Sequence, residues 1–178
     1  TNPQHFFYLL QQEQETVKAK EKSLNMIMPQ LLQTQINAKV KPRITVFEGK
    51  KGLITVLEDV LKTGKTNLVF STTIPYMLHD YLEGFHRRRI RSKITDKIIL
   101  NKKEMKRAKK LARMHYTKTK VIGSGFESPI TLNIYGDKVG MLILSEEPIA
   151  VLIEDKNVHE AFTHYFEIVW RMAEAVKP

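Results

Sequence analysis

The sequence predicts an α/β fold, a mixed sheet flanked by helices and preceded by a long N-terminal helix. Two observations carry this prediction. Strand and helix patterns alternate after residue 41, and a two-residue turn signal, Gly136-Asp137, then separates two apolar segments. At 178 residues the chain is long enough for one such domain with a core. We therefore divide it into a coiled-coil helix over 1–40 and a domain over 41–178.

The N-terminal segment carries apolar residues one heptad apart at Leu10, Val17, Leu24 and Leu31. This spacing places them on one seam of a helix and predicts a coiled coil. We expect the chain to form a homodimer through this seam. Packing of the helix on its own domain is the alternative.

Two strand-helix units follow. Residues 43–47 (RITVF) read as a strand and 53–61 as an amphipathic helix that ends at Gly64. Residues 67–71 (NLVFS) have the continuous apolar character of a buried parallel strand, and Pro75 opens the next helix. A third strand is expected over 94–100, followed by a basic helix from 101 to about 115.

The last third predicts antiparallel pairing. Segments 132–135 and 139–144 flank Gly136-Asp137 as the strands of a hairpin, and 149–153 reads as one more strand. A helix beginning near Asn157 closes the chain. It carries an apolar stripe that should face the core, at Val158, Phe162, Tyr165, Val169, Met172 and Val176.

Positive charge is concentrated between Arg87 and Lys120. This block holds fifteen basic and two acidic residues, so its net charge of +13 exceeds the +10 of the whole chain. Such a block favours an anionic partner, although a solvated helix face is the simpler explanation. The densest part predicts an anion-binding cluster at Arg87, Arg88, Arg89 and Arg91.

Polar residues follow the predicted strands where a ligand would bind in an open α/β sheet. If the strands are parallel, their carboxyl ends share one rim, and we expect a pocket there. Helix capping by the hydroxyls is the simpler alternative. The predicted ligand-binding residues are Glu48, Ser71, Thr72, Thr73 and Asn101.

The sequence gives little support for a metal site, a nucleophile, a nucleotide-binding loop or a membrane span. The chain has no cysteine, and none of its six histidines has a partner at the i, i+4 spacing of a helical zinc site. Gly123-Ser124-Gly125 fits neither a nucleophile elbow nor a P-loop. No apolar run approaches the ~20 residues of a membrane span. We expect a cytoplasmic protein with no metal, cofactor, catalytic residues or membrane partner.

The order of motifs resembles the region after the winged helix in TrmB-like transcriptional regulators. The motifs are RITVFEGKKGLITVLEDVL, NLVFST, LNIYGDKVGML and HEAFTHYFEIVWRMA, preceded by the heptad helix. The resemblance implies a phospholipase D-like effector domain and an upstream winged helix that binds DNA. Catalytic phospholipase D relatives need His-x-Lys, and no histidine here is followed by lysine two residues later.

The resemblance thus implies a non-catalytic, dimeric module that senses a small effector, such as a sugar or a phosphorylated metabolite. Binding would change the placement of the DNA-binding winged helices. Two alternatives stay open. One is a phosphodiesterase or nuclease of phospholipase D-like fold, and the other is a basic module that adds non-specific DNA affinity.

Overall fold

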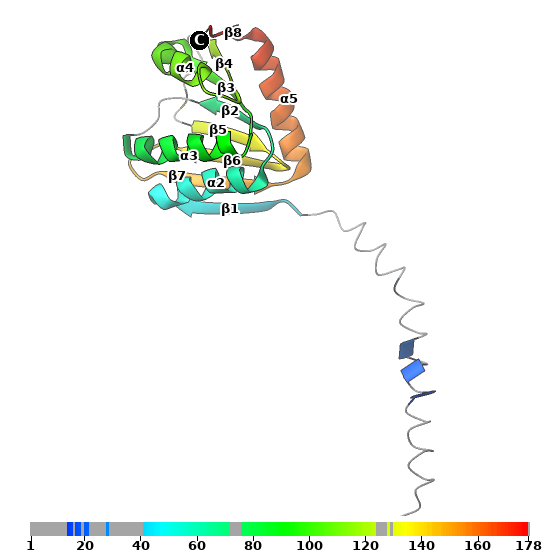
Figure 1. Cartoon of the computed structure of the whole chain (residues 1–178). Helices are drawn as coiled ribbons and strands as arrows, with labels where there is room; N and C mark the ends of the chain where they lie inside the picture. The colour runs from blue at the N-terminus through cyan, green and yellow to red at the C-terminus, as the bar shows by residue number, and fades with distance from the viewer. Residues whose placement is uncertain are drawn as a thin grey trace, which may run out of the picture. The chain divides into compact units, whose positions relative to one another are not determined.

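The structure is a computed structural model of the whole chain (Figure 1). It describes residues 41–71, 76–123, 128 and 130–177, together with seven positions between 14 and 28. The chain divides into two units, Thr1–Lys41 and Pro42–Pro178, and the second is described below. Of the predicted seam residues, Val17 is helical and exposed. Leu10, Leu24 and Leu31 lie outside the described residues.

The second unit alternates strands and helices before it turns to antiparallel strands. Its elements are β1 (Arg43–Glu48), α2 (Gly49–Thr63), β2 (Asn67–Ser71), η1 (Tyr76–Leu78), α3 (His79–Arg91), β3 (Asp96–Asn101), η2 (Lys102–Glu104), α4 (Met105–Ala112), β4 (Thr117–Ile122), β5 (Ile130–Tyr135), β6 (Lys138–Ile143), β7 (Ile149–Glu154), α5 (Lys156–Met172) and β8 (Glu174–Ala175).

The strands form one eight-stranded mixed sheet in the order β1-β7-β6-β5-β2-β3-β4-β8. Strands β2, β3 and β4 pair in parallel, while β1, β7, β6, β5 and β2 pair successively antiparallel, as does β8 with β4. The predicted α/β class with a mixed sheet is therefore confirmed.

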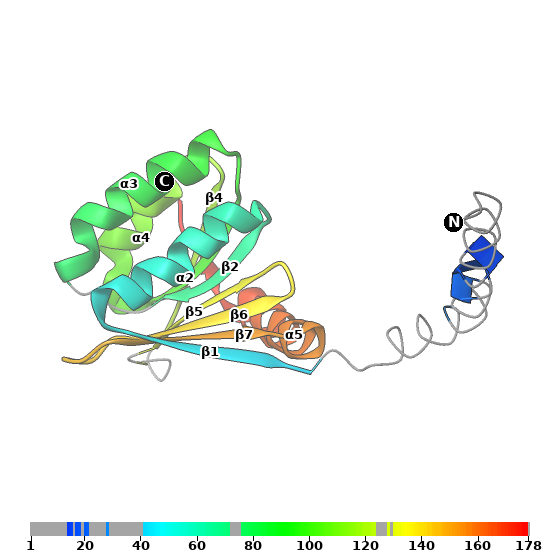
Figure 2. The same cartoon turned by 90° about the horizontal axis from the view of Figure 1, so that it is seen from below.

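Helices cover both faces of the sheet (Figure 2). Helices α2, α3 and α4 lie on one face and α5 on the other. Strand alternation produces this division. In β2, Val69 packs in the α4 cluster, whereas Leu68 and Phe70 pack against Phe166 of α5. The face under α2, α3 and α4 also holds the candidate site.

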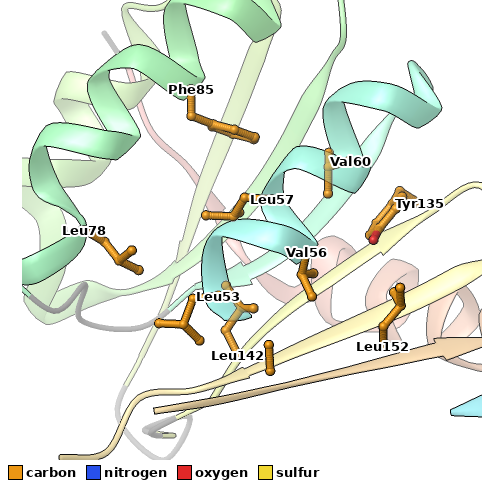
Figure 3. Close-up of a cluster of buried hydrophobic side chains, with 10 residues drawn as sticks. Leu53, Val56, Leu57, Val60, Leu78, Phe85, Tyr135, Leu142 and Leu152 are labelled. Carbon is orange, nitrogen blue, oxygen red and sulfur yellow. The ribbon is translucent and has the colours of Figure 1, made fainter. Parts of the chain in front are cut away.

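Helix α2 supplies much of the core on that face (Figure 3). Its Leu53, Val56 and Val60 are completely buried and belong to a cluster with residues of β5, β6, β7 and α3. These positions recur at helical spacing, which is why this segment forms an amphipathic helix. Gly64 adopts a left-handed φ of 69°, and its N–H donates to the Val60 carbonyl, which ends the helix as predicted.

The predicted hairpin is also present. Gly136 adopts a φ of 55° in the turn between β5 and β6, a conformation that favours glycine. Asp59 of α2 fastens this turn, because its carboxylate accepts from the Tyr135 hydroxyl at 2.9 Å and pairs with Lys138 Nζ at 2.8 Å. The basic helix is shorter than predicted: α4 ends at Ala112, and β4 begins at Thr117.

Candidate ligand-binding site

Three polar side chains line up under the helices on adjacent strands. They are Asn67 of β2, Asp96 of β3 and Asn133 of β5, and each is at most 2% exposed. Asn67 Nδ2 lies 3.3 Å from Asp96 Oδ1 and 3.2 Å from Asn133 Oδ1. Asn67 Oδ1 and Asn133 Nδ2 have no hydrogen-bond partner among the described residues. Because an unpaired buried polar group is costly, these two atoms point to a missing partner.

These residues line a cavity between the sheet and the helices. Its volume is about 60 Å³, which accommodates a few water molecules or one polar group of a ligand. The walls are mostly apolar, which is typical of small-molecule sites. The polar lining consists of Asn67, Ser71, His86, Asp96, Arg107, Thr131 and Asn133.

A larger groove of about 700 Å³ adjoins the cavity between α3 and α4. Leu82, His86, Arg107 and Leu111 line both spaces, so these side chains form the boundary between them. The charged groups along the groove are Arg87, Arg107 and Lys110 with Glu83 and Glu104, and its histidines are His79 and His86.

The boundary residues lie in a positive field. Burial, together with the charges of Arg89, Arg107 and Lys110, lowers the pKa of His86 to about 4, so the imidazole is neutral at pH 7. Its Nδ1 is buried without a partner among the described residues. Burial also lowers the pKa of Arg107 to about 10, although Glu104 partly opposes this effect. Arg107 remains charged at neutral pH.

The structure brings only one of the described predicted ligand residues into this cavity. Ser71, at the end of β2, lines it and accepts a hydrogen bond from Arg107 Nη2 at 2.9 Å. Asn101 instead caps η2, because its side-chain oxygen accepts from Lys103 N at 2.9 Å. Thr72 and Thr73 lie outside the described residues.

The prediction that Glu48 shares this pocket is wrong. Strand β1 runs in the same direction as β2, but β7, β6 and β5 lie between them. Four strand spacings put Glu48 roughly 19 Å from Ser71 along the sheet. The carboxyl ends of β1 and β2 do point to the same edge of the sheet, but Glu48 is too far from Ser71 to bind the same small ligand.

The predicted anion-binding cluster is also divided by the structure. Arg87 lines the groove, and Arg91 is exposed. Arg88 is bound bidentately by Glu58, with distances of 2.7 and 2.9 Å. The prediction is wrong for Arg89. It is completely buried and pairs with Asp96, so it cannot contact an anion at the surface.

Sequence reasoning missed four residues that define the site: Asn67, His86, Arg107 and Asn133. Asn67 and Asn133 stand inside apolar runs, NLVFS and LNIY, where an asparagine in a buried strand is the available signal. His86 and Arg107 lie within the charged block and resemble its surface residues. What sets them apart is their place in the fold, where they line both the cavity and the groove.

The described residues contain no group of three or more histidines and carboxylates that could hold a metal ion. Their helices include none that is long and apolar enough to cross a membrane. What the described site offers is therefore hydrogen-bonding and charged groups around a hydrophobic cavity.

The mixed sheet with helices on both faces is the fold of phospholipase D-like proteins. Nuc, a phospholipase D family member from Salmonella typhimurium, shares it with a TM-score of 0.60 and 12% identity over 78% of this chain and 100% of Nuc. NucT from Helicobacter pylori shares it with a TM-score of 0.56 and 12% identity over 76% of this chain and 99% of NucT.

TrmBL2, an archaeal chromatin protein with a novel mode of DNA binding, is also similar. The TM-score is 0.55, and 21% of residues are identical over 97% of this chain and 67% of TrmBL2. No protein-family model and no curated protein matches the sequence. At these identities the likeness establishes the fold, which a DNA-binding protein and a phospholipase D family member share.

Proposed function

We propose that this chain is the effector-sensing and dimerisation part of a TrmB-like transcriptional regulator and that it binds its effector without turning it over. The cavity carries this proposal. Asn67 Oδ1 and Asn133 Nδ2, both buried and unpartnered among the described residues, offer one acceptor and one donor to a polar ligand. The similarity to TrmBL2 across nearly the whole chain supports a DNA-binding context.

The proposed coupling uses the two units of the chain. A ligand that binds between the sheet and α3 would favour one arrangement of the domain. Paired N-terminal helices would transmit that preference to winged helices upstream. A coupling free energy of about 1 to 3 kcal/mol between effector and DNA is sufficient for such regulation.

A thermal-unfolding panel of sugars, sugar phosphates and nucleotides tests effector binding. A ligand at 100 times its dissociation constant adds about 2.7 kcal/mol and should raise the midpoint by several degrees. The shift should vanish in Asn133→Ala and persist in Asn101→Ala, which removes another buried asparagine that does not line the cavity. A shift that survives Asn133→Ala would place the ligand elsewhere and contradict the proposal.

A hydrolysis assay tests the proposal that the chain does not turn over its ligand. His86 is the histidine next to the proposed ligand site, so a phosphodiesterase of this fold would depend on it. We expect no hydrolysis of a generic phosphodiester such as bis-p-nitrophenyl phosphate. Hydrolysis by the wild type that is lost in His86→Ala would favour a phospholipase D-like enzyme instead.

A second candidate function rests on the exposed face of η2 and α4. Its basic residues could contact DNA phosphates beside an upstream winged helix, adding affinity but no sequence preference. The exposed residues are Lys102, Lys103, Lys106, Lys109, Lys110 and Arg113. Duplex binding by this chain that falls steeply with salt would support this candidate, and weak salt-insensitive binding would remove it.

A further inference from the structure

We propose that the groove between α3 and α4 binds the phosphate of a small phosphorylated polyol whose hydroxyl end enters the cavity behind it. This inference rests on the proposed function, because it names the chemical class of the effector for that same site. Three features of the molecule support a phosphorylated polyol: the charges along the groove, the boundary between groove and cavity, and the unpartnered atoms inside the cavity.

The first feature is a positive field that nearby carboxylates do not cancel at the boundary. Arg87, Arg107 and Lys110 line the groove, where Glu83 and Glu104 are the acidic residues. At His86 the electrostatic effects that shift the pKa all come from cations, namely Arg89, Arg107 and Lys110. An anion placed in the groove would relieve this repulsion.

The second feature is the position of Arg107. Its guanidinium is largely buried, with 22% of the side chain exposed, and it lines both the groove and the cavity. It donates to Ser71 Oγ at 2.9 Å, and its ion pair with Glu104 spans 4.0 Å. A guanidinium is a planar cation whose donor geometry suits phosphate oxygens, and this one stands where the groove meets the cavity.

The third feature is the chemistry of the cavity. Asn67 Oδ1 accepts, Asn133 Nδ2 donates, and neutral His86 can use Nδ1 as either. A hydroxyl group both donates and accepts, so it can satisfy such a mixed set, whereas a second anion cannot. The small volume limits the entering part to one or two hydroxyl-bearing carbons.

The same features favour a small molecule over DNA as the ligand of the groove. A phosphate of duplex DNA could reach the open groove, but no part of the duplex backbone could enter a cavity of about 60 Å³ between sheet and helices. The unpartnered asparagine atoms lie on β2 and β5, beyond the boundary residues. We therefore assign the groove to a small phosphorylated ligand.

Binding is tested by NMR titration of the full chain with glycerol phosphate, with inorganic phosphate and glycerol as its two halves. We expect saturable binding of glycerol phosphate that is at least about tenfold tighter than that of either half, since each half uses one compartment. Bound phosphate should raise the pKa of His86. Absence of saturable binding by glycerol phosphate and by inorganic phosphate would overturn the inference.

Two double variants of equal net charge separate a specific site from general electrostatics. Arg87→Gln with Lys110→Gln removes two groove cations, while Arg91→Gln with Lys109→Gln removes two exposed cations from the same helices that do not line it. We expect the groove variant to weaken glycerol phosphate binding about tenfold or more and the control to weaken it less than threefold. Equal losses would overturn the inference.

The remaining outcomes distinguish this inference from the function on which it rests. A neutral ligand could raise the melting midpoint of the wild type and of the groove variant but not that of Asn133→Ala. That result would support effector sensing and contradict the proposal that the effector carries a phosphate. A short DNA duplex that binds through the groove cations, with no binding of glycerol phosphate, would reject the inference in favour of a DNA contact.

Discussion

Arg89 Nε lies 2.9 Å from Asp96 Oδ2, and both side chains are withdrawn from solvent. The guanidinium also donates to the carbonyls of Ile94 and Tyr116 at 2.7 and 2.8 Å, and to Thr117 Oγ1 at 2.7 Å. One side chain from α3 therefore fastens the starts of β3 and β4. Asp96 extends the network through Asn67 to the candidate site.

Removal of Arg89 should be strongly destabilising. Arg89→Met leaves the Asp96 carboxylate buried without its counter-charge and removes one donor from the carbonyls of Ile94 and Tyr116, so we expect a loss of about 3 to 5 kcal/mol in the free energy of unfolding. Urea denaturation at pH 7 measures this loss. The control, Arg91→Met on the exposed side of the same helix, should change stability by less than about 0.5 kcal/mol. Equal effects of the two variants would show that the buried pair is not structurally important.

Arg89 also shows where sequence reasoning stops. In the run HRRRIR four arginines look alike, and which one is buried depends on how α3 lies on β3 and β4. That arrangement depends on strands that begin up to 28 residues later along the chain. By contrast, local patterns such as Gly64 after α2 and Gly136 before β6 were sufficient to place helix ends and turns.

The candidate site was predictable to the same limited extent. Ser71 could be anticipated because a strand end is a local feature of the sequence. The pairing of Asn67 with Asn133 could not, because 66 residues separate them and only the register of β2 with β5 brings them together. The prediction for Glu48 was wrong for a related reason. The direction of a strand can be estimated from local sequence, but the order of strands in the sheet cannot.

Two helical glycines should respond oppositely to alanine. A Cβ at Gly52 of α2 would lie 2.7 Å from the Phe47 carbonyl carbon, a backbone atom of the preceding strand, whereas a Cβ at Gly84 of α3 meets nothing within 4 Å. We expect Gly52→Ala to cost about 1 to 3 kcal/mol through overpacking. Gly84→Ala should add up to about 1 kcal/mol through helix propensity. Thermal unfolding of both variants tests the close approach of α2 to β1, and stabilisation by Gly52→Ala would refute it.

The proposed coiled coil makes a prediction that is independent of the domain. Leu24→Asp places a charge in the predicted seam of the N-terminal helix, so the dimer should dissociate to monomers at micromolar concentration. Asn25→Asp adds the same charge one residue away from the seam and should leave the dimer intact. Light scattering after size exclusion gives both masses. A Leu24→Asp variant that stays dimeric would show that the copies associate through another surface.

The burial of His86 predicts how stability changes with pH. Its pKa is about 4 in the folded protein and near 6.5 when unfolded, so between these values the unfolded chain binds the additional proton. The stability from the neutral imidazole is fully present above pH 6.5 and is lost as the pH falls through 4. Asp96 acts oppositely, because burial raises its pKa to about 6, and its contribution is lost as the pH rises through that value.

A comparison of His86→Gln with the wild type isolates the histidine, because Asp96 is present in both proteins. Between pH 7 and pH 4 the wild type should lose up to about 3 kcal/mol of unfolding free energy relative to the variant. Urea titrations at half-unit pH intervals measure the difference. His115→Gln, which replaces an exposed histidine, should run parallel to the wild type. If the difference between His86→Gln and the wild type is constant across this range, neither burial nor the nearby cations lower the pKa of His86.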